Sequence, residues 1–127
     1  MSKLLLTLDG GGIRGAATTQ FLLRIDQALQ ADHGCALRDC VDLYAGTSTG
    51  SIIALALGTT RLSLEALNDL YGVASAQAIF AENRGWFEID GINAPRYEAE
   101  GKASVLEREF GAARLGDVPE GKHVLAV

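Results

Sequence analysis

Cysteine, histidine and long apolar runs are scarce in this chain. Its 127 residues include two histidines and two cysteines, Cys35 and Cys40, which are not spaced as Cys-x-x-Cys. A zinc site is therefore not expected, and buried free thiols are the default for such a chain. The apolar run at residues 4–8 meets Asp9 at once, so it is too short for the apolar core of a secretion signal. No apolar run approaches the roughly 18 residues that a membrane-spanning helix needs.

The chain also lacks a net positive charge. The formal net charge is −5 at pH 7, so the molecule as a whole offers no electrostatic footprint for nucleic acid. These absences together predict a soluble, cytoplasmic protein with no zinc site and no nucleic-acid partner.

Hydrophobic residues, in contrast, make up 48% of the chain. That share is enough for a hydrophobic core and too high for a disordered chain, and the length suits one domain. Apolar runs at 4–8, 43–45 and 123–127 predict strands, and the first and last of them are expected to be buried on both faces. Helices are expected at 16–31, at 51–57 with Gly58 as its end, from Ser63 onward and at 103–110. The core face of the first helix is predicted to consist of Phe21, Leu22, Ile25 and Leu29.

This alternation of strands and helices predicts an α/β fold, a three-layer α/β/α arrangement with a mostly parallel sheet. The last strand has no helix after it, although a parallel strand needs cover on both faces. Residues 1–127 are therefore expected to be the N-terminal part of a single, longer α/β domain.

The segment Gly46-Thr47-Ser48-Thr49-Gly50 stands between a predicted strand and a predicted helix. A Gly-x-Ser-x-Gly pattern in this setting is typical of a nucleophile elbow, in which a tight turn strains the serine backbone and pushes its hydroxyl outward. Side chains at the two glycines would clash with the neighbouring strand and helix. Ser48 is therefore the candidate nucleophile, and the alternative is an ordinary turn at a helix N-terminus.

A glycine-rich turn, Asp9-Gly10-Gly11-Gly12-Ile13-Arg14-Gly15, follows the first predicted strand. Its backbone amides and the next helix N-terminus suit an anion. One interpretation is a dinucleotide pyrophosphate, because Gly10-x-Gly12-x-x-Gly15 matches the Rossmann fingerprint. Another is the oxyanion of an acyl-transfer intermediate, held by the amides of Gly11 and Gly12. The presence of Ser48 and the positive charge of Arg14 favour the oxyanion, and a turn without a ligand is the third alternative.

These two motifs, in this order and at this separation, resemble the opening of a patatin-like phospholipase. The resemblance extends over the whole chain, including the segments 93–97 and 109–111. It implies a lipid acyl hydrolase with a Ser–Asp dyad, in which Ser48 attacks a fatty-acyl ester. The turn of Gly10, Gly11 and Gly12 would hold the oxyanion and Arg14 would support it. It also implies a lipid substrate, transient contact with a membrane surface, and neither metal nor organic cofactor.

The general base is where this sequence departs from the family pattern. The resemblance implies an aspartate in an Asp-Gly-Gly or Asp-Gly-Ala motif well downstream of Ser48. Asp90 precedes Gly91 but lacks the third small residue, and Asp117 lies in a polar turn. The base is therefore expected beyond Val127, and the 127-residue chain by itself is expected to be nearly inactive.

Other residues leave alternatives open. His33 and His123 invite a Ser-His-Asp triad, but a histidine at the surface or at a strand end is the favoured interpretation. Trp86, Phe87 and Ile89 suit either the core or an acyl pocket. Two rival functions also remain at this point: a nucleotide-binding module that uses Gly10-x-Gly12-x-x-Gly15, and a non-catalytic remnant that binds lipid or a partner protein.

Overall fold

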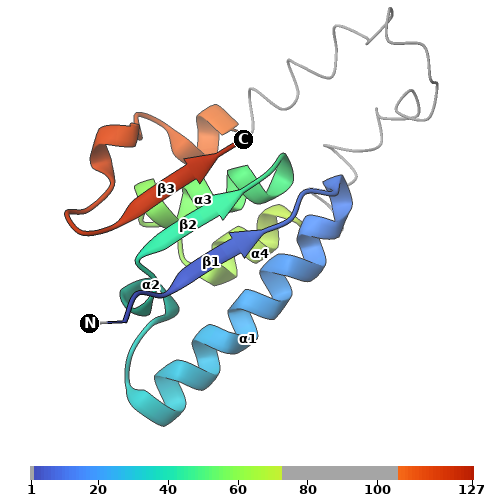
Figure 1. Ribbon diagram of the computed structural model, residues 1–127. Helices are drawn as coiled ribbons and strands as arrows, with labels where there is room; N and C mark the ends of the chain where they lie inside the picture. Colours follow the sequence, from blue (N-terminus) through green and yellow to red (C-terminus); the bar gives the residue numbers. More distant parts are fainter. Residues whose placement is uncertain (1, 73–105) are drawn as a thin grey trace, which may run out of the picture.

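A three-stranded parallel sheet organises the molecule (Figure 1). The computed structural model describes residues 2–72 and 106–127. Strands β1 (Leu5–Leu8), β2 (Leu43–Gly46) and β3 (His123–Ala126) lie in the order β1-β2-β3. The register pairs Leu8 with Gly46, and Gly46 with Ala126, so the three strands end at the same edge. All three predicted strands and their parallel arrangement are confirmed.

Helices occupy the connections between the strands. They are α1 (Gly15–His33), the single turn α2 (Leu37–Cys40), α3 (Thr49–Thr59) and α4 (Leu64–Leu70), with short 3-10 turns η1 (Gly12–Arg14) and η2 (Leu115–Asp117). Residues 106–110 are also helical, and the predicted start of that helix lies outside the described residues. No helix in the two described ranges is long and apolar enough to cross a membrane.

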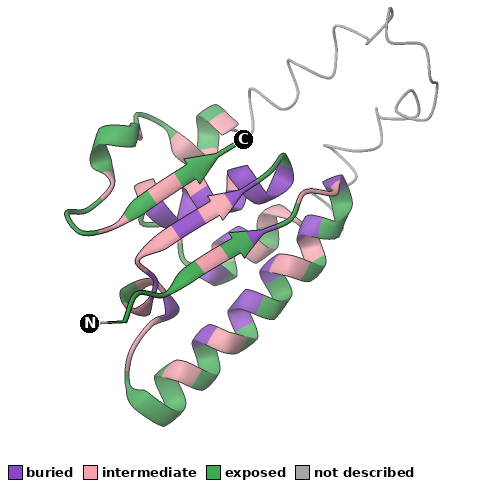
Figure 2. Ribbon diagram, viewed as in Figure 1, coloured by how far each residue is buried: buried purple, intermediate pink, exposed green. Residues whose placement is uncertain are grey.

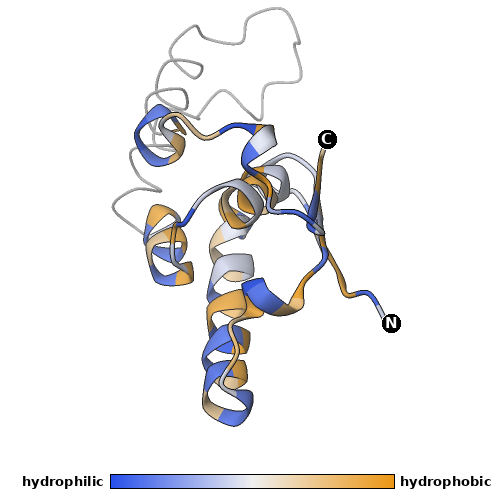
Figure 3. Ribbon diagram, turned by 90° about the vertical axis from the view of Figure 1, so that its left-hand side faces the viewer, coloured by the Kyte–Doolittle hydropathy of each residue, from blue (hydrophilic) through white to orange (hydrophobic). Residues whose placement is uncertain are grey.

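The helices all lie on one face of the sheet. Figure 3 shows the sheet edge-on with every described helix on the same side. On the other face Leu5 is 58% exposed and Leu125 is 56% exposed. The expectation that these strands are buried on both faces is therefore wrong for the described residues. Connections between parallel strands are nearly always right-handed, and the order β1-β2-β3 advances in one direction, so both connections place their helices on the same face.

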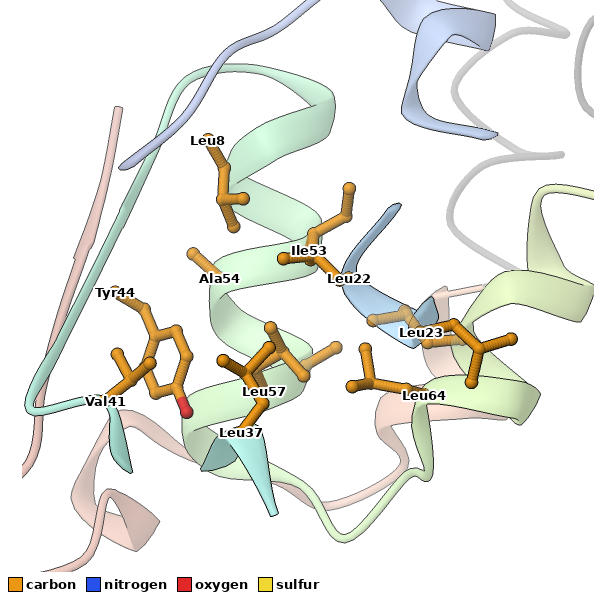
Figure 4. Packing of buried hydrophobic residues seen from close by; sticks show 12 residues of the cluster. Leu8, Leu22, Leu23, Leu37, Val41, Tyr44, Ile53, Ala54, Leu57 and Leu64 are labelled. Atoms are coloured by element: carbon orange, nitrogen blue, oxygen red, sulfur yellow. The ribbon is translucent and has the colours of Figure 1, made fainter. Parts of the chain in front are cut away.

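The core lies between that face of the sheet and the helices (Figures 2 and 4). α3 is apolar around most of its circumference and packs directly on the sheet, which is why Ile53, Ala54 and Ala56 are fully buried. Tyr44 reaches the core from β2 and Leu22 reaches it from α1. The remaining buried apolar residues are Leu8, Leu23, Leu37, Val41, Leu57, Leu64 and Leu67.

The buried face of α1 differs from the predicted one. Leu22 is buried, and Ile25 and Leu29 pack against the core, but Phe21 is 66% exposed. The face is centred on Thr19, Leu22, Leu23 and Asp26, which follow the i, i+3, i+4, i+7 spacing of a helix. Two of these residues are polar, and both are buried with hydrogen-bond partners: Thr19 Oγ1 donates to Asn68 Oδ1 at 3.1 Å, and Asp26 accepts from the Leu37 amide at 2.7 Å.

Helix ends follow the predicted signals, with one exception. α1 ends before Gly34, which has φ 66°, and the Ser63 hydroxyl accepts from the Ala66 amide at 3.1 Å to cap α4. α3, however, does not stop at Gly58 but continues to Thr59. Gly58 lies inside the helix because a Cβ there would overlap the Val124 side chain on β3. Gly58 therefore does not end the helix. Its role is to let α3 pack closely against the sheet.

Candidate active site

The two glycine-containing turns meet at the carboxyl edge of the sheet. Because Leu8 pairs with Gly46, the turn after β1 and the turn after β2 begin side by side. The Thr47 amide also donates to the Leu8 carbonyl at 3.2 Å. The carboxyl edge of a parallel sheet is where ligands of α/β proteins usually bind.

Ser48 has the strained backbone expected of an elbow. Its φ of 51° and ψ of −120° make it the one non-glycine residue with positive φ in the described ranges. Its amide donates to the Val127 carbonyl at 3.1 Å, and its carbonyl accepts from the Ser51 amide at 2.9 Å. Ser48 is exposed, and its Oγ has no hydrogen-bond partner among the described residues. The described residues thus hold the Ser48 backbone firmly, and its hydroxyl stays exposed and unpaired among them.

The flanking glycines are required by close packing. A Cβ on Gly46 would overlap the backbone of Gly50, and a Cβ on Gly50 would overlap the Leu8 carbonyl. The strand, the turn and the first turn of α3 therefore contact one another through bare backbone. The predicted steric need for glycine at both positions is confirmed.

Two threonines connect the elbow to the glycine-rich turn, a role that the sequence did not predict. Thr47 Oγ1 accepts from the Gly10 amide at 3.0 Å. Thr49 Oγ1 donates to the Gly12 carbonyl at 3.2 Å, and that bond is buried. The two hydroxyls flank Ser48 in sequence, so the serine is tied to the neighbouring turn from both sides. The position of these two hydroxyl residues directly beside Ser48 was the feature of the sequence from which this role could have been predicted.

Within the described residues, three amides near Ser48 remain available for an anion. The amide of Gly10 is occupied by Thr47, whereas those of Gly11, Gly12 and Thr49 have no acceptor within the part of the chain that the structure describes. Thr49 is the first residue of α3, so its amide is one of the unpaired N–H groups at a helix N-terminus. The arrangement offers the donors that an oxyanion hole needs, although not the one from Gly10.

Arg14 folds back over the glycine-rich turn. Its Nε donates to the Gly11 carbonyl at 3.5 Å, and a Cβ on Gly11 would come within 2.7 Å of the same nitrogen. Gly11 has φ 146° and Gly12 has φ 56°, both of which favour glycine. The guanidinium therefore lies against the turn and keeps a positive charge beside its amides.

Comparison with known proteins agrees with this geometry. The family described as Patatin-like phospholipase matches residues 6–119, which include both turns. The chain belongs to the patatin-like phospholipase family. Phospholipase A I of Arabidopsis thaliana is 38% identical over 79 residues, which cover 62% of this chain and 6% of that protein.

Two further relatives match more of the chain. The 85/88 kDa calcium-independent phospholipase A2 of Rattus norvegicus is 34% identical over 122 residues, covering 95% of this chain and 13% of that protein. Patatin-like protein 2 of Oryza sativa subsp. indica is 28% identical over 123 residues, covering 87% of this chain and 30% of that protein. The chain thus spans less than a third of the length of each of these three relatives. A phospholipase family favours the oxyanion interpretation of the glycine-rich turn over the dinucleotide one.

The other titratable candidates of this patatin-like chain lie away from Ser48. His123 pairs with Leu43 at the amino end of the sheet, roughly 10 Å of strand from the carboxyl edge. His33 is exposed at the far end of α1, whose 19 residues span about 28 Å. Asp117 is exposed and accepts from the Arg114 amide at 2.6 Å. The prediction of surface or strand-end histidines is confirmed, and Asp90 and the segment 86–89 lie outside the described residues.

A cavity of about 610 Å³ lies at the amino edge of the sheet, opposite Ser48. Two of the cations on its wall, Lys122 and Arg38, are held by the chain itself. Lys122 Nζ donates to the carbonyls of Arg38, Asp39 and Val41 at 3.0, 2.9 and 2.6 Å. The Arg38 guanidinium donates to the Leu62 carbonyl at 2.6 Å. Through these contacts Lys122 joins the start of β3 to α2, and Arg38 joins α2 to the α3–α4 connection.

Proposed function

We propose that this chain carries the nucleophile and the oxyanion hole of a serine lipid acyl hydrolase of the phospholipase A type. The observation that carries the proposal is Ser48, which is strained and exposed beside the glycine-rich turn. The amides of Gly11, Gly12 and Thr49 have no acceptor among the described residues. Family membership supplies the substrate class, a fatty-acyl ester of a lipid.

In the proposed reaction the Ser48 hydroxyl attacks the ester carbonyl and gives its proton to a general base. The carbonyl oxygen becomes negative in the tetrahedral intermediate, and the three amides donate hydrogen bonds to it. Collapse of the intermediate releases the alcohol part of the lipid, which takes up the proton, and leaves an acyl group on Ser48. Water then hydrolyses this acyl-enzyme.

The base of the proposed dyad is an aspartate beyond Val127, and residues 1–127 are proposed to be the N-terminal part of one catalytic domain. Removing one member of such a catalytic pair costs on the order of 10⁴ in rate or more. The 127-residue chain is therefore expected to turn over lipid esters at a small fraction of the rate of a longer form.

Contact with a lipid surface is part of the proposal. Ile13 lies in η1 beside the candidate oxyanion amides and is 57% exposed. An apolar side chain in this position suits a substrate whose acyl chain must leave a membrane or micelle. The proposal places the protein in the cytoplasm, where it would touch membranes transiently.

A labelling experiment tests the function. The longest natural form of the protein is treated with a fluorophosphonate, and a lipid ester assay runs in parallel. We expect one label on Ser48, and both label and turnover should disappear in Ser48→Ala. Ser63→Ala, which removes a capping hydroxyl from α4, is the matched control and should keep both. Binding of lipid by a folded protein that takes no label would instead favour the non-catalytic alternative.

A further inference from the structure

The two cysteines of the chain lie at either end of α2. Cys35 follows Gly34, where α1 ends, and Cys40 is the last residue of α2. Their sulfur atoms are 3.5 Å apart, both thiols are free, and both side chains are partly exposed. The sequence predicts buried free thiols. The thiols are free, but the prediction of burial is wrong, because both side chains are partly exposed.

The fold, rather than chance side-chain positions, holds these thiols together. Asp26 accepts from the Leu37 amide at 2.7 Å at the start of α2. At the other end, Lys122 donates to three carbonyls between residues 38 and 41. One helical turn anchored at both ends fixes the separation of the residues that flank it. Such pre-organisation raises the effective concentration of one thiol at the other.

The contact also affects the titration of the thiols. The hydrogen bond to Cys40 raises the pKa of the Cys35 thiol. Since the thiolate is the attacking form, exchange at this pair should become faster as the pH rises above neutral.

We propose that Cys35 and Cys40 form a modification site that closes into a reversible intramolecular disulfide. The oxidant is a low-molecular-weight disulfide. One protein thiolate attacks it, forms a mixed disulfide and releases one small thiolate. The second protein thiol loses its proton and attacks the protein sulfur of that mixed disulfide, which releases the second small thiolate. The protein loses two electrons and two protons, and the small disulfide is reduced to two thiols.

The site lies at the amino edge of the sheet, away from the elbow. Cys40 is separated from β2 by Val41 and Asp42, and Ser48 follows the opposite end of that strand. Closure would therefore clamp the α1–β2 connection without contacting Ser48. The inference does not depend on the proposed function.

The experiment uses the full chain, reduced and then incubated with oxidised glutathione. The reaction is stopped with acid, remaining thiols are alkylated, and intact mass and peptide mapping identify the products. We expect a Cys35–Cys40 disulfide in at least about ten-fold excess over glutathionylated chain, and complete return to two thiols with dithiothreitol. Cys35→Ser and Cys40→Ser, which cannot close the ring, should each accumulate one bound glutathione instead.

Three outcomes would overturn the inference. The wild-type chain could accumulate bound glutathione as the single variants do, or it could stay reduced under conditions that modify both of them. It could also form disulfide-linked dimers. Circular dichroism of the Cys35→Ser/Cys40→Ser double variant checks that the fold does not need either thiol.

Discussion

The strain in the Ser48 backbone should be measurable as stability. A non-glycine residue at φ 51° and ψ −120° costs about 1–3 kcal/mol, and glycine removes most of this cost. Glycine also makes the unfolded chain more flexible, which offsets about 0.5–1 kcal/mol. Ser48→Gly should therefore be more stable than Ser48→Ala by about 0.5–2 kcal/mol. Ala is the correct reference, because it keeps the strain and removes only a hydroxyl that has no partner among the described residues.

Urea denaturation of the two variants, followed by circular dichroism, is the assay. With a slope of about 1–3 kcal/mol per molar urea for small proteins, the midpoint of Ser48→Gly should lie about 0.5 M above that of Ser48→Ala. Both variants lack the nucleophile, so neither should take a fluorophosphonate label. Equal midpoints, or a lower midpoint for Ser48→Gly, would refute the claim that the elbow stores strain.

Three further predictions concern the contacts around the two edges of the sheet. Thr49→Val removes a buried hydroxyl that donates to Gly12, so it should destabilise the chain by about 1 kcal/mol and slow labelling of Ser48. Lys122→Met removes three hydrogen bonds from one ammonium group, so it should lower the free energy of unfolding by about 2 kcal/mol in a denaturation experiment. The control is Lys3→Met, which removes the exposed ion pair with Asp42 and should lower the free energy of unfolding by less than about 1 kcal/mol. Hydrogen bonds from Lys3 and from the Leu4 amide hold the pKa of the Asp42 carboxyl below its ordinary value. The stability contributed by this carboxylate is therefore complete above the ordinary pKa of an aspartate, about 4, and is lost as the pH falls through the lowered pKa. A pH series of denaturation midpoints should show that loss in the wild type and not in Asp42→Asn.

The elbow and the glycine-rich turn could be found in the sequence because their requirements are local. A tight turn between strand and helix needs glycine at positions where backbones touch, and both motifs carry their glycines at fixed spacing. Ser48, Gly11 and Gly12 were identified in this way. The hydrogen bond from the Gly10 amide to Thr47 could not be identified in this way, because it joins residues that are 37 positions apart in the sequence.

The buried polar residues were missed for a related reason. Thr19 and Asp26 interrupt the apolar stripe of α1. The predicted core face was therefore placed too close to Phe21, which is exposed in the structure. Each is buried because its partner comes from elsewhere in the chain: Asn68 from α4 and Leu37 from α2. Hydrophobic periodicity does not register a polar side chain that is buried with its hydrogen bonds satisfied.

By itself the sequence determined the alternation of strands and helices, the parallel sheet, the candidate nucleophile and the family, because apolar spacing and glycine chemistry act over a few residues. Only the tertiary structure decided which face of the sheet is covered, which amides near Ser48 lack an acceptor among the described residues, and that Cys35 contacts Cys40. These features depend on the direction in which the chain winds and on side chains that meet across the fold. Their physical cause is the packing of distant segments, which no local pattern encodes.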